Sequence, residues 1–213
     1  KEFVKDPIAV IDNFTNPEEQ NFFKKSLVEP KAQFLLNENT IDEAYQSGYK
    51  GRPLEIDSPQ FVLPVYHEKS PPAIRNPLLF SNIYILLDRI NLSNYFIDRI
   101  KFNITFPFPQ ATSKNYMPIH TDGGEYFKSI IYYVNDCDGD TLFFEDNIAC
   151  PYPKIIDRVS PKQGRAVIFD SKTPHAGCNP INSTSRQILN IVLYKYRMNK
   201  EKANGSKWVK SNN

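Results

Sequence analysis

Several residue types that often reveal a protein's class are scarce in this chain of 213 residues. Only 3 cysteines occur, Cys137, Cys150 and Cys178, and their odd number and lack of CxxC spacing argue against a disulfide framework or a zinc knuckle. No apolar run approaches the roughly 18 residues of a membrane span, and the N-terminal residues lack a signal-peptide pattern. We therefore expect a soluble, cytoplasmic protein with no membrane partner.

A strong excess of charge is also missing. The chain has 26 basic and 24 acidic residues, which gives a formal net charge of +2. Because this balance gives the protein no strongly positive electrostatic potential that would attract nucleic acid, we expect no nucleic-acid partner. The 40% content of hydrophobic residues suffices for one globular domain with a sizeable core, and the sequence leaves the oligomeric state open.

Helical patterns are confined to the N-terminal half of the chain. A short apolar strand, "IAVI", precedes a predicted helix from about Pro17 to Leu27, with Asn16 as N-cap and Glu19 completing a capping box. The segment "LLFSNIYILLDRI" has apolar residues at helical spacing and predicts a second helix that packs on a sheet. Residues 29–77 hold many of the 17 prolines and predict irregular structure with one or two short strands, such as "FVLPVY".

Short β-branched and aromatic runs dominate the chain from Arg99 onward. Turn-forming residues separate these runs, which is typical of an antiparallel sandwich or barrel. We expect one domain over residues 1–213, mainly β with flanking helices, in which 1–98 pack on a core formed by 99–197 and 198–213 form a polar tail. The runs are "RIKFNITF", "FKSIIYYVN", "TLFFED", "RAVIFD" and "RQILNIVLYKY".

The stretch "MPIHTDGG" places His120 two residues before Asp122. Residues i and i+2 of an extended segment point to the same side, so both side chains can converge on one point. His175, in "FDSKTPHAG", adds a third candidate ligand. Two imidazoles and one carboxylate form the facial triad of non-haem Fe(II) sites, which leaves neighbouring coordination positions open for other ligands. The three residues therefore predict a catalytic metal site.

An arginine follows the second histidine at a distance that allows a pairing between strands. If residues 179–182 form a hairpin loop, Cys178 pairs with Ser183, and counting back along both strands places His175 opposite Arg186. Arg186 would then stand about one small dicarboxylate's length from the metal, with its guanidinium ready to bind a carboxylate, a geometry that suits 2-oxoglutarate. The alternative is a salt bridge between Arg186 and Asp170 on a neighbouring strand.

The order of these motifs resembles the Fe(II)/2-oxoglutarate-dependent dioxygenases, and within them the prolyl 4-hydroxylase-like branch. The resemblance covers roughly residues 99–196 and implies a double-stranded β-helix core, also called a jelly roll or cupin-like fold. It implies that His120, Asp122 and His175 bind Fe(II), that Arg186 binds the C5 carboxylate of 2-oxoglutarate, and that Tyr133 hydrogen-bonds the same carboxylate. The motifs are "HTD", "IIYYVND", "GDTLFFED", "PKQGRAVIFDSKTPHAG" and "SRQILNIVLY".

The sequence departs from the family pattern at several positions. Many members carry a tyrosine in the strand before the HxD motif, where this chain offers Asn103 or Thr105 as co-substrate contacts. Tyr116 is interpreted either as a substrate contact or as a packing residue. The residue two after the arginine is Ile188 instead of serine, which leaves Asn190 as the polar residue on the same face.

Two residues keep open interpretations. Tyr133 could instead be a sheet residue whose hydroxyl reaches the rim, although the match of "IYYVN" to the family favours co-substrate binding. His67 is expected at the surface or in the substrate region, because no ligand partner accompanies it in the sequence.

The resemblance implies hydroxylation of a C–H bond with Fe(II), 2-oxoglutarate and dioxygen, and with ascorbate as a possible reductant. The expected substrate is a prolyl residue in a peptide or protein, or a free amino acid, with residues 29–77 and 106–115 as walls of its site. Asp122 favours hydroxylation over halogenation, and Val192 stands where nucleic-acid dealkylases of the family carry a second arginine. The alternative is a catalytically silent, cupin-like metal-binding module that holds a peptide or a sugar.

Overall fold

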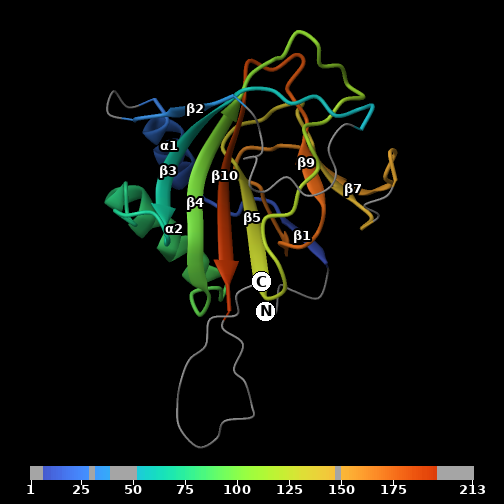
Figure 1. Cartoon of the computed structure of the whole chain (residues 1–213). Helices are drawn as coiled ribbons and strands as arrows, with labels where there is room; N and C mark the ends of the chain where they lie inside the picture. Colours follow the sequence, from blue (N-terminus) through green and yellow to red (C-terminus); the bar gives the residue numbers. More distant parts are fainter. Residues whose placement is uncertain (1–6, 29–31, 39–51, 147–149, 196–213) are drawn as a thin grey trace, which may run out of the picture.

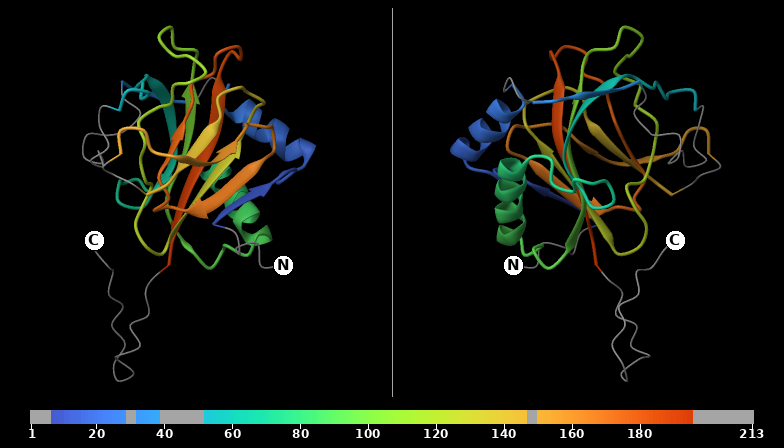
Figure 2. Two further views of the ribbon diagram at one scale, coloured as in Figure 1. Left: turned by 90° about the vertical axis from the view of Figure 1, so that its right-hand side faces the viewer. Right: turned by 60° about the vertical axis from the view of Figure 1, so that its left-hand side comes forward.

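The structure is a computed structural model, and it describes residues 7–28, 32–38, 52–146 and 150–195 (Figure 1). A large and a small antiparallel sheet face each other, and two helices cover the outer side of the large sheet. Both views of Figure 2 show the helices on one side of the large sheet and the small sheet on the other. Among the described helices, none is long and apolar enough to cross a membrane.

The first five strands belong to the large sheet, and the later part of the chain passes back and forth between the two sheets. The large sheet has the order β1-β8-β5-β10-β4-β3-β2, and the small sheet has the order β7-β6-β9. The sheet of the predicted core therefore also contains strands from the N-terminal part of the chain. The elements are β1 (Ile8–Ile11), α1 (Pro17–Ser26), β2 (Leu35–Asn37), β3 (Gln60–His67), α2 (Pro77–Arg89), β4 (Phe96–Thr105), β5 (Phe127–Tyr133), β6 (Thr141–Phe144), β7 (Ile155–Val159), β8 (Ala166–Asp170), β9 (His175–Gly177) and β10 (Arg186–Tyr194).

Both predicted helices are present and pack on the large sheet. Helix α1 begins with the predicted capping box, in which Asn16 accepts from the backbone N–H of Glu19 and Glu19 accepts from that of Asn16. Phe23 of α1 and Ile83 of α2 are almost fully buried in the same cluster as Phe102 of the sheet. Burial of such side chains stabilises the fold by about 1.5–3 kcal/mol each, so the helices hold the sheet from behind.

Alternation along the strands of the large sheet separates its two faces. On β4, Ile100 and Phe102 belong to the cluster under the helices. Lys101 and Asn103, which alternate with them along the strand, have the opposite orientation and line a cavity between the sheets. A second apolar cluster lies on this inner side and includes Phe143 of the small sheet, so part of the space between the sheets is filled.

The predicted pairing of His175 with Arg186 is wrong. β9 joins β6 in the small sheet, whereas β10 lies between β4 and β5 in the large sheet, and Arg186 stands opposite Thr105. The chain between these strands crosses from one sheet to the other, so it forms no hairpin. The carboxylate of Asp138 fastens this crossing by accepting hydrogen bonds from the backbone of residues 181–183.

The proline-rich region is more regular than its composition predicts. β3 spans eight residues and pairs with β4 along much of its length. Pro64 lies in this strand at a register shift between residues 64 and 66, which explains how the sheet accommodates a residue without an N–H. The remaining parts of the predicted irregular region at 29–31 and 39–51, and the predicted tail, lie outside the described residues.

Candidate metal centre

His120, Asp122 and His175 meet at one point between the sheets. One potential ligand atom from each lies within 4.8 Å of the others. His120 and His175 also exchange two backbone hydrogen bonds, of 3.0 and 2.9 Å, so the HxD segment runs beside β9 as an added antiparallel partner. The predicted convergence of the three side chains is therefore confirmed, and the backbone of the small sheet produces it.

Asp122 is held by partners on β4, β5 and β10 and by the turn that follows β8. Its backbone N–H donates to the carbonyl of Ser171 at 2.9 Å, and its carboxylate pairs with Arg99. One carboxylate oxygen accepts from Ser129 at 2.8 Å and from Asn190 at 3.2 Å, and the same oxygen lies 3.6 Å from Nε2 of His175. These contacts fix the orientation of the carboxylate, as the outer partners of metal ligands commonly do.

Both imidazoles have a geometry that frees Nε2 for a metal. Nδ1 of His120 lies 3.1 Å from the carbonyl of Pro118, and Nδ1 of His175 lies 3.0 Å from that of Thr173. A carbonyl oxygen only accepts, so each Nδ1 carries the hydrogen and each Nε2 presents a lone pair.

Charge states at the site also suit metal binding. Burial, followed by the nearby His175, lowers the pKa of His120 to about 4, and burial lowers the pKa of His175 as well. For Asp122, burial opposes ionisation, but Arg99 and the two histidines outweigh it and hold the pKa of the carboxyl below its usual range. At neutral pH the three groups are two neutral imidazoles and one carboxylate, the forms that bind a divalent cation.

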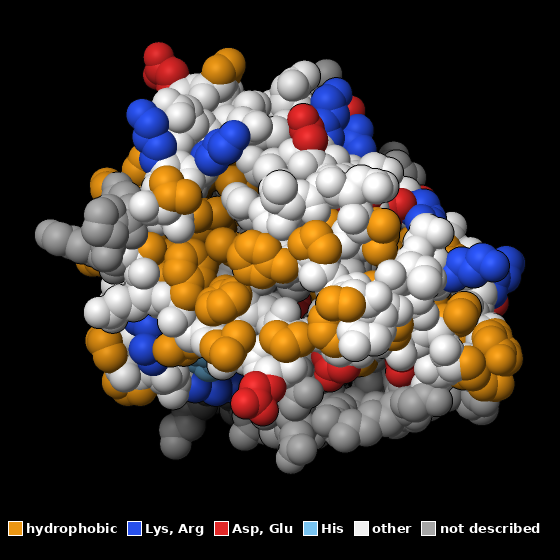
Figure 3. Space-filling view, turned by 90° about the horizontal axis from the view of Figure 1, so that it is seen from above, with side chains coloured by type: hydrophobic (Ala, Val, Ile, Leu, Met, Phe, Trp, Pro, Cys, Tyr) orange, Lys and Arg blue, Asp and Glu red, His pale blue; other side chains and the backbone are white. Residues whose placement is uncertain are grey.

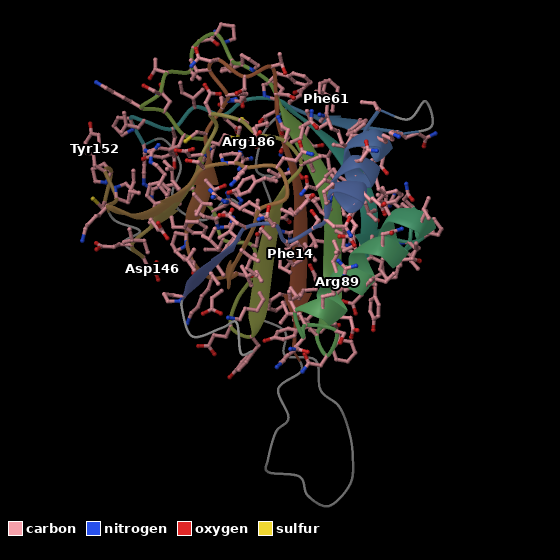
Figure 4. All side chains as sticks on the ribbon, turned by 180° about the vertical axis from the view of Figure 1, so that it is seen from behind. Phe14, Phe61, Arg89, Asp146, Tyr152 and Arg186 are labelled. Carbon is pink, nitrogen blue, oxygen red and sulfur yellow. The ribbon has the colours of Figure 1, made fainter. Side chains whose placement is uncertain are left out.

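Arg186 enters the same cavity from β10. Its Nε donates to the carbonyl of Gly139 at 2.8 Å, and its Nη2 donates to the hydroxyl of Thr141 at 2.8 Å. Tyr133 donates to the same hydroxyl at 2.7 Å. The hydroxyl hydrogen of Thr141 therefore remains available to a further acceptor, and Nη1 of Arg186 has no hydrogen-bond partner within the described parts of the chain. Figure 4 labels Arg186 in the interior of the barrel.

Several buried polar atoms around this cavity have no partner. Oδ1 of Asn103, Oγ1 of Thr105 and Oδ1 of Asn190 are buried without a hydrogen bond among the described residues, and all three residues line the cavity. Each such atom costs free energy unless a ligand or water satisfies it. The free donors of Arg186 and Thr141, together with the Thr105 hydroxyl, fit a carboxylate at the Arg186 end of the cavity. The amide oxygens of Asn103 and Asn190 only accept, so they call for water or for a donor group of a ligand.

Comparison with known proteins shows which fold this architecture has. No protein-family model and no curated protein matches the sequence. Solved structures do match, and a 2OG-Fe(II) oxygenase family oxidoreductase from Burkholderia pseudomallei is 12% identical over 91% of this chain and 87% of its own, with a TM-score of 0.63. The chain has the 2-oxoglutarate–Fe(II) oxygenase fold. The predicted jelly-roll core is thereby confirmed.

Two further structures with this fold differ in their reactions. A prolyl hydroxylase from Trichoplax adhaerens, in complex with a hypoxia inducible factor oxygen degradation domain peptide fragment, is 16% identical over 91% of this chain and 86% of its own, with a TM-score of 0.54. The alpha ketoglutarate dependent carbocyclase SnoK from nogalamycin biosynthesis is 11% identical over 99% of this chain and 92% of its own, with a TM-score of 0.58. The oxygenase fold alone therefore does not select the reaction.

The structure shows the surroundings of the residues whose roles the sequence left open. Tyr116 is buried and packs its ring against Phe144, with centroids 5.1 Å apart, which is a packing role. Asn103 donates to Gln60 at 2.6 Å, and Tyr133 reaches Thr141 rather than the rim. The alternative salt bridge from Arg186 to Asp170 is absent, because Asp170 pairs with Lys128.

Sequence reasoning missed Arg99, Lys101, Ser129 and Thr141. The two basic residues alternate with buried residues on the same strand as Asn103, so the strand period could have identified them. No local signal marks Thr141, because its contact with Arg186 joins residues 45 positions apart on facing sheets.

A second cleft opens from the metal centre on the side of β3. Its volume is about 320 Å³, and His120 and Asp122 form part of its wall. His67 and Arg75 also line it, which places His67 in the region where a substrate would approach. Seen from the end of the barrel where β4 finishes, hydrophobic side chains gather over a hollowed surface (Figure 3).

Proposed function

We propose that the protein is an Fe(II)- and 2-oxoglutarate-dependent oxygenase that hydroxylates a C–H bond. The observation that carries this proposal is that His120, Asp122, His175 and Arg186 line one cavity. A binding module needs a metal site or a pocket, but it does not need a metal triad that shares one cavity with an arginine whose guanidinium still has a free donor.

Iron(II) and 2-oxoglutarate, when bound, would supply the activation of dioxygen, with succinate and carbon dioxide as products and ascorbate as an optional reductant. The residues of the chain supply position and charge. Arg186 Nη1 and the Thr141 hydroxyl would bind the far carboxylate of the co-substrate, while Tyr133 holds that hydroxyl in place. Asn190 donates to the Asp122 carboxylate and, like Arg186, lies on β10. One strand therefore carries both the residue that orients a metal ligand and the residue that would bind the co-substrate.

The proposed substrate is a prolyl residue in a peptide or a free amino acid. The resemblance of the sequence motifs to the prolyl 4-hydroxylase-like branch supports this choice, and a prolyl hydroxylase is among the proteins that share the fold. The cleft beside the metal supports it further, because its volume of about 320 Å³ suits a side chain or a small molecule rather than a large polymer.

Anaerobic titration with Fe(II) followed by 2-oxoglutarate tests the proposal. A visible charge-transfer absorption should appear when both are bound, and admission of dioxygen should release succinate even without substrate. The change His175→Ala should abolish the absorption and the succinate.

The variant His67→Ala is the matched control, because it removes the one histidine outside the triad. It should keep both signals. Metal binding without any release of succinate, by the unaltered protein, would instead support the silent binding module.

A further inference from the structure

We infer that the substrate carries a carboxylate, which Lys101 and Arg75 bind in the cleft beside the metal centre. This inference rests on the proposed function and narrows its substrate class to small acids, of which a free amino acid is one. It concerns the second cleft, on the β3 side of the metal, and not the cavity that ends at Arg186.

Lys101 is a half-buried cation at the junction of the two spaces. It stands opposite Pro64 on β3 and Asn190 on β10, and it lines both the cavity and the cleft. Among the described residues it makes no hydrogen bond or ion pair, and burial, followed by the charge of Arg99, lowers the pKa of its ammonium to about 8. Its ammonium faces the two spaces without an anionic partner among the described residues, so it is available to pair with a bound anion.

The wall of the cleft carries more positive than negative charge. Its described residues include three cations, Arg75, Arg99 and Lys101, and one carboxylate, Asp122. Arg99 already pairs with Asp122, and a bound divalent metal would add positive charge beside them. Arg75 lies at the exposed rim, where Nη2 donates to the hydroxyl of Ser70 at 3.0 Å. Lys101 and Arg75 are therefore the cations left to bind an incoming anion.

The rest of the cleft fits a hydrocarbon portion. Val62, Pro64 and Tyr66 of β3 contribute apolar surface, and the metal ligands close the inner end. A small molecule with its carboxylate between Lys101 and Arg75 would lay its carbon skeleton against β3, beside the metal ligands. A residue inside a peptide chain offers no backbone carboxylate, so this arrangement favours a free acid over an internal prolyl residue.

The two carboxylates of 2-oxoglutarate do not explain these cations. One of them would have Arg186 and Thr141 as partners, and the metal would take the other. Arg75 lines the cleft and not the cavity, so it is available only to a molecule in the cleft.

Calorimetric binding to the protein loaded with Mn(II) and 2-oxoglutarate tests the inference without turnover. The probes are the free L-amino acids, each compared with its C-terminal amide. At least one acid should bind about tenfold or more tightly than its amide. The variants Lys101→Met and Arg75→Gln should each remove most of that preference. Arg75→Gln, which lies outside the co-substrate cavity, should also leave the affinity for 2-oxoglutarate unchanged. Lys114→Met, which neutralises an exposed lysine outside the cleft, is the control and should leave the preference intact.

Two results would overturn the inference. The first is that every amide binds as tightly as its acid. The second is that Lys101→Met weakens 2-oxoglutarate binding and leaves the preference for acids intact, which would assign Lys101 to the co-substrate. In either case, unchanged metal binding and succinate release would preserve the proposed function. A glutamyl peptide blocked at both ends, compared with free glutamate, distinguishes a side-chain carboxylate from that of a free acid.

Discussion

His120 and His175 form an antiparallel backbone pair. His120 N–H donates to the carbonyl of His175 at 3.0 Å, His175 N–H donates to that of His120 at 2.9 Å, and the ring centroids lie 4.5 Å apart. Residues that exchange both bonds present their side chains on the same face of a sheet. The spacing of the two imidazoles is therefore set by a sheet register, and metal binding does not have to assemble them.

Close packing against Arg186 makes Gly177 a sensitive position. A Cβ at Gly177 would lie 3.2 Å from Cζ and Nη1 of Arg186. Because the guanidinium is already fixed by two hydrogen bonds, Gly177→Ala should displace it by a few tenths of an ångström and weaken 2-oxoglutarate binding by about tenfold. A Cβ at Gly124 meets nothing within 4 Å, so Gly124→Ala is the matched control. Equal affinity in both variants, measured by calorimetry, would contradict the proposed place of the co-substrate.

For 2-oxoglutarate binding, the hydroxyl of Thr141 should matter more than the shape of its side chain. Thr141→Val removes the acceptor shared by Arg186 and Tyr133, and we expect the 2-oxoglutarate concentration needed for half-maximal succinate release to rise roughly tenfold. Thr141→Ser keeps the hydroxyl and should behave nearly as the unaltered protein. Similar loss in the two variants would show that the methyl group, and not the hydrogen bonds, determines binding.

Ser129 should tune the metal affinity from outside the ligand set. It donates to the Asp122 carboxylate and contacts the hydroxyl of Ser171 at 2.7 Å. Ser129→Ala should weaken Fe(II) binding by about tenfold or more, as measured by competition with a chelator. Ser26→Ala, which removes a hydroxyl that bonds only within helix α1, should leave the metal affinity unchanged. Unaltered affinity in the Ser129 variant would count against its role.

Acid should destabilise the metal-free protein through its buried histidines. The pKa of His120 falls from 6.5 in the unfolded chain to about 4 in the folded one, so between these values the unfolded chain binds the additional proton. Stability is complete above the unfolded pKa and declines as the pH falls toward the folded pKa, by roughly 2 kcal/mol from His120 between about pH 7 and about pH 5. The pKa of His175 moves in the same direction.

Urea unfolding in the presence of a chelator measures this dependence. The variant His120→Asn should reduce the loss between the two pH values, because it removes one of the titrating groups. An identical midpoint at both pH values in the unaltered protein would contradict the assigned protonation states.

The sequence by itself determined the local features of this protein. The capping box at Asn16 and Glu19 depends on residues three apart, and the shared orientation of His120 and Asp122 follows from the two-residue period of extended backbone. Both features are present in the structure because the interactions that produce them lie within one helical turn or one extended segment.

The tertiary structure decided which strands meet. Counting along an assumed hairpin brought His175 to Arg186, whereas the chain crosses between sheets and the two residues approach from opposite walls of one cavity. The contacts from Arg99 to Asp122 and from Thr141 to Arg186 likewise join separate elements. Pairing between strands is set by burial of the inner and outer faces of the whole sheet, so no local pattern in the sequence specifies these partners.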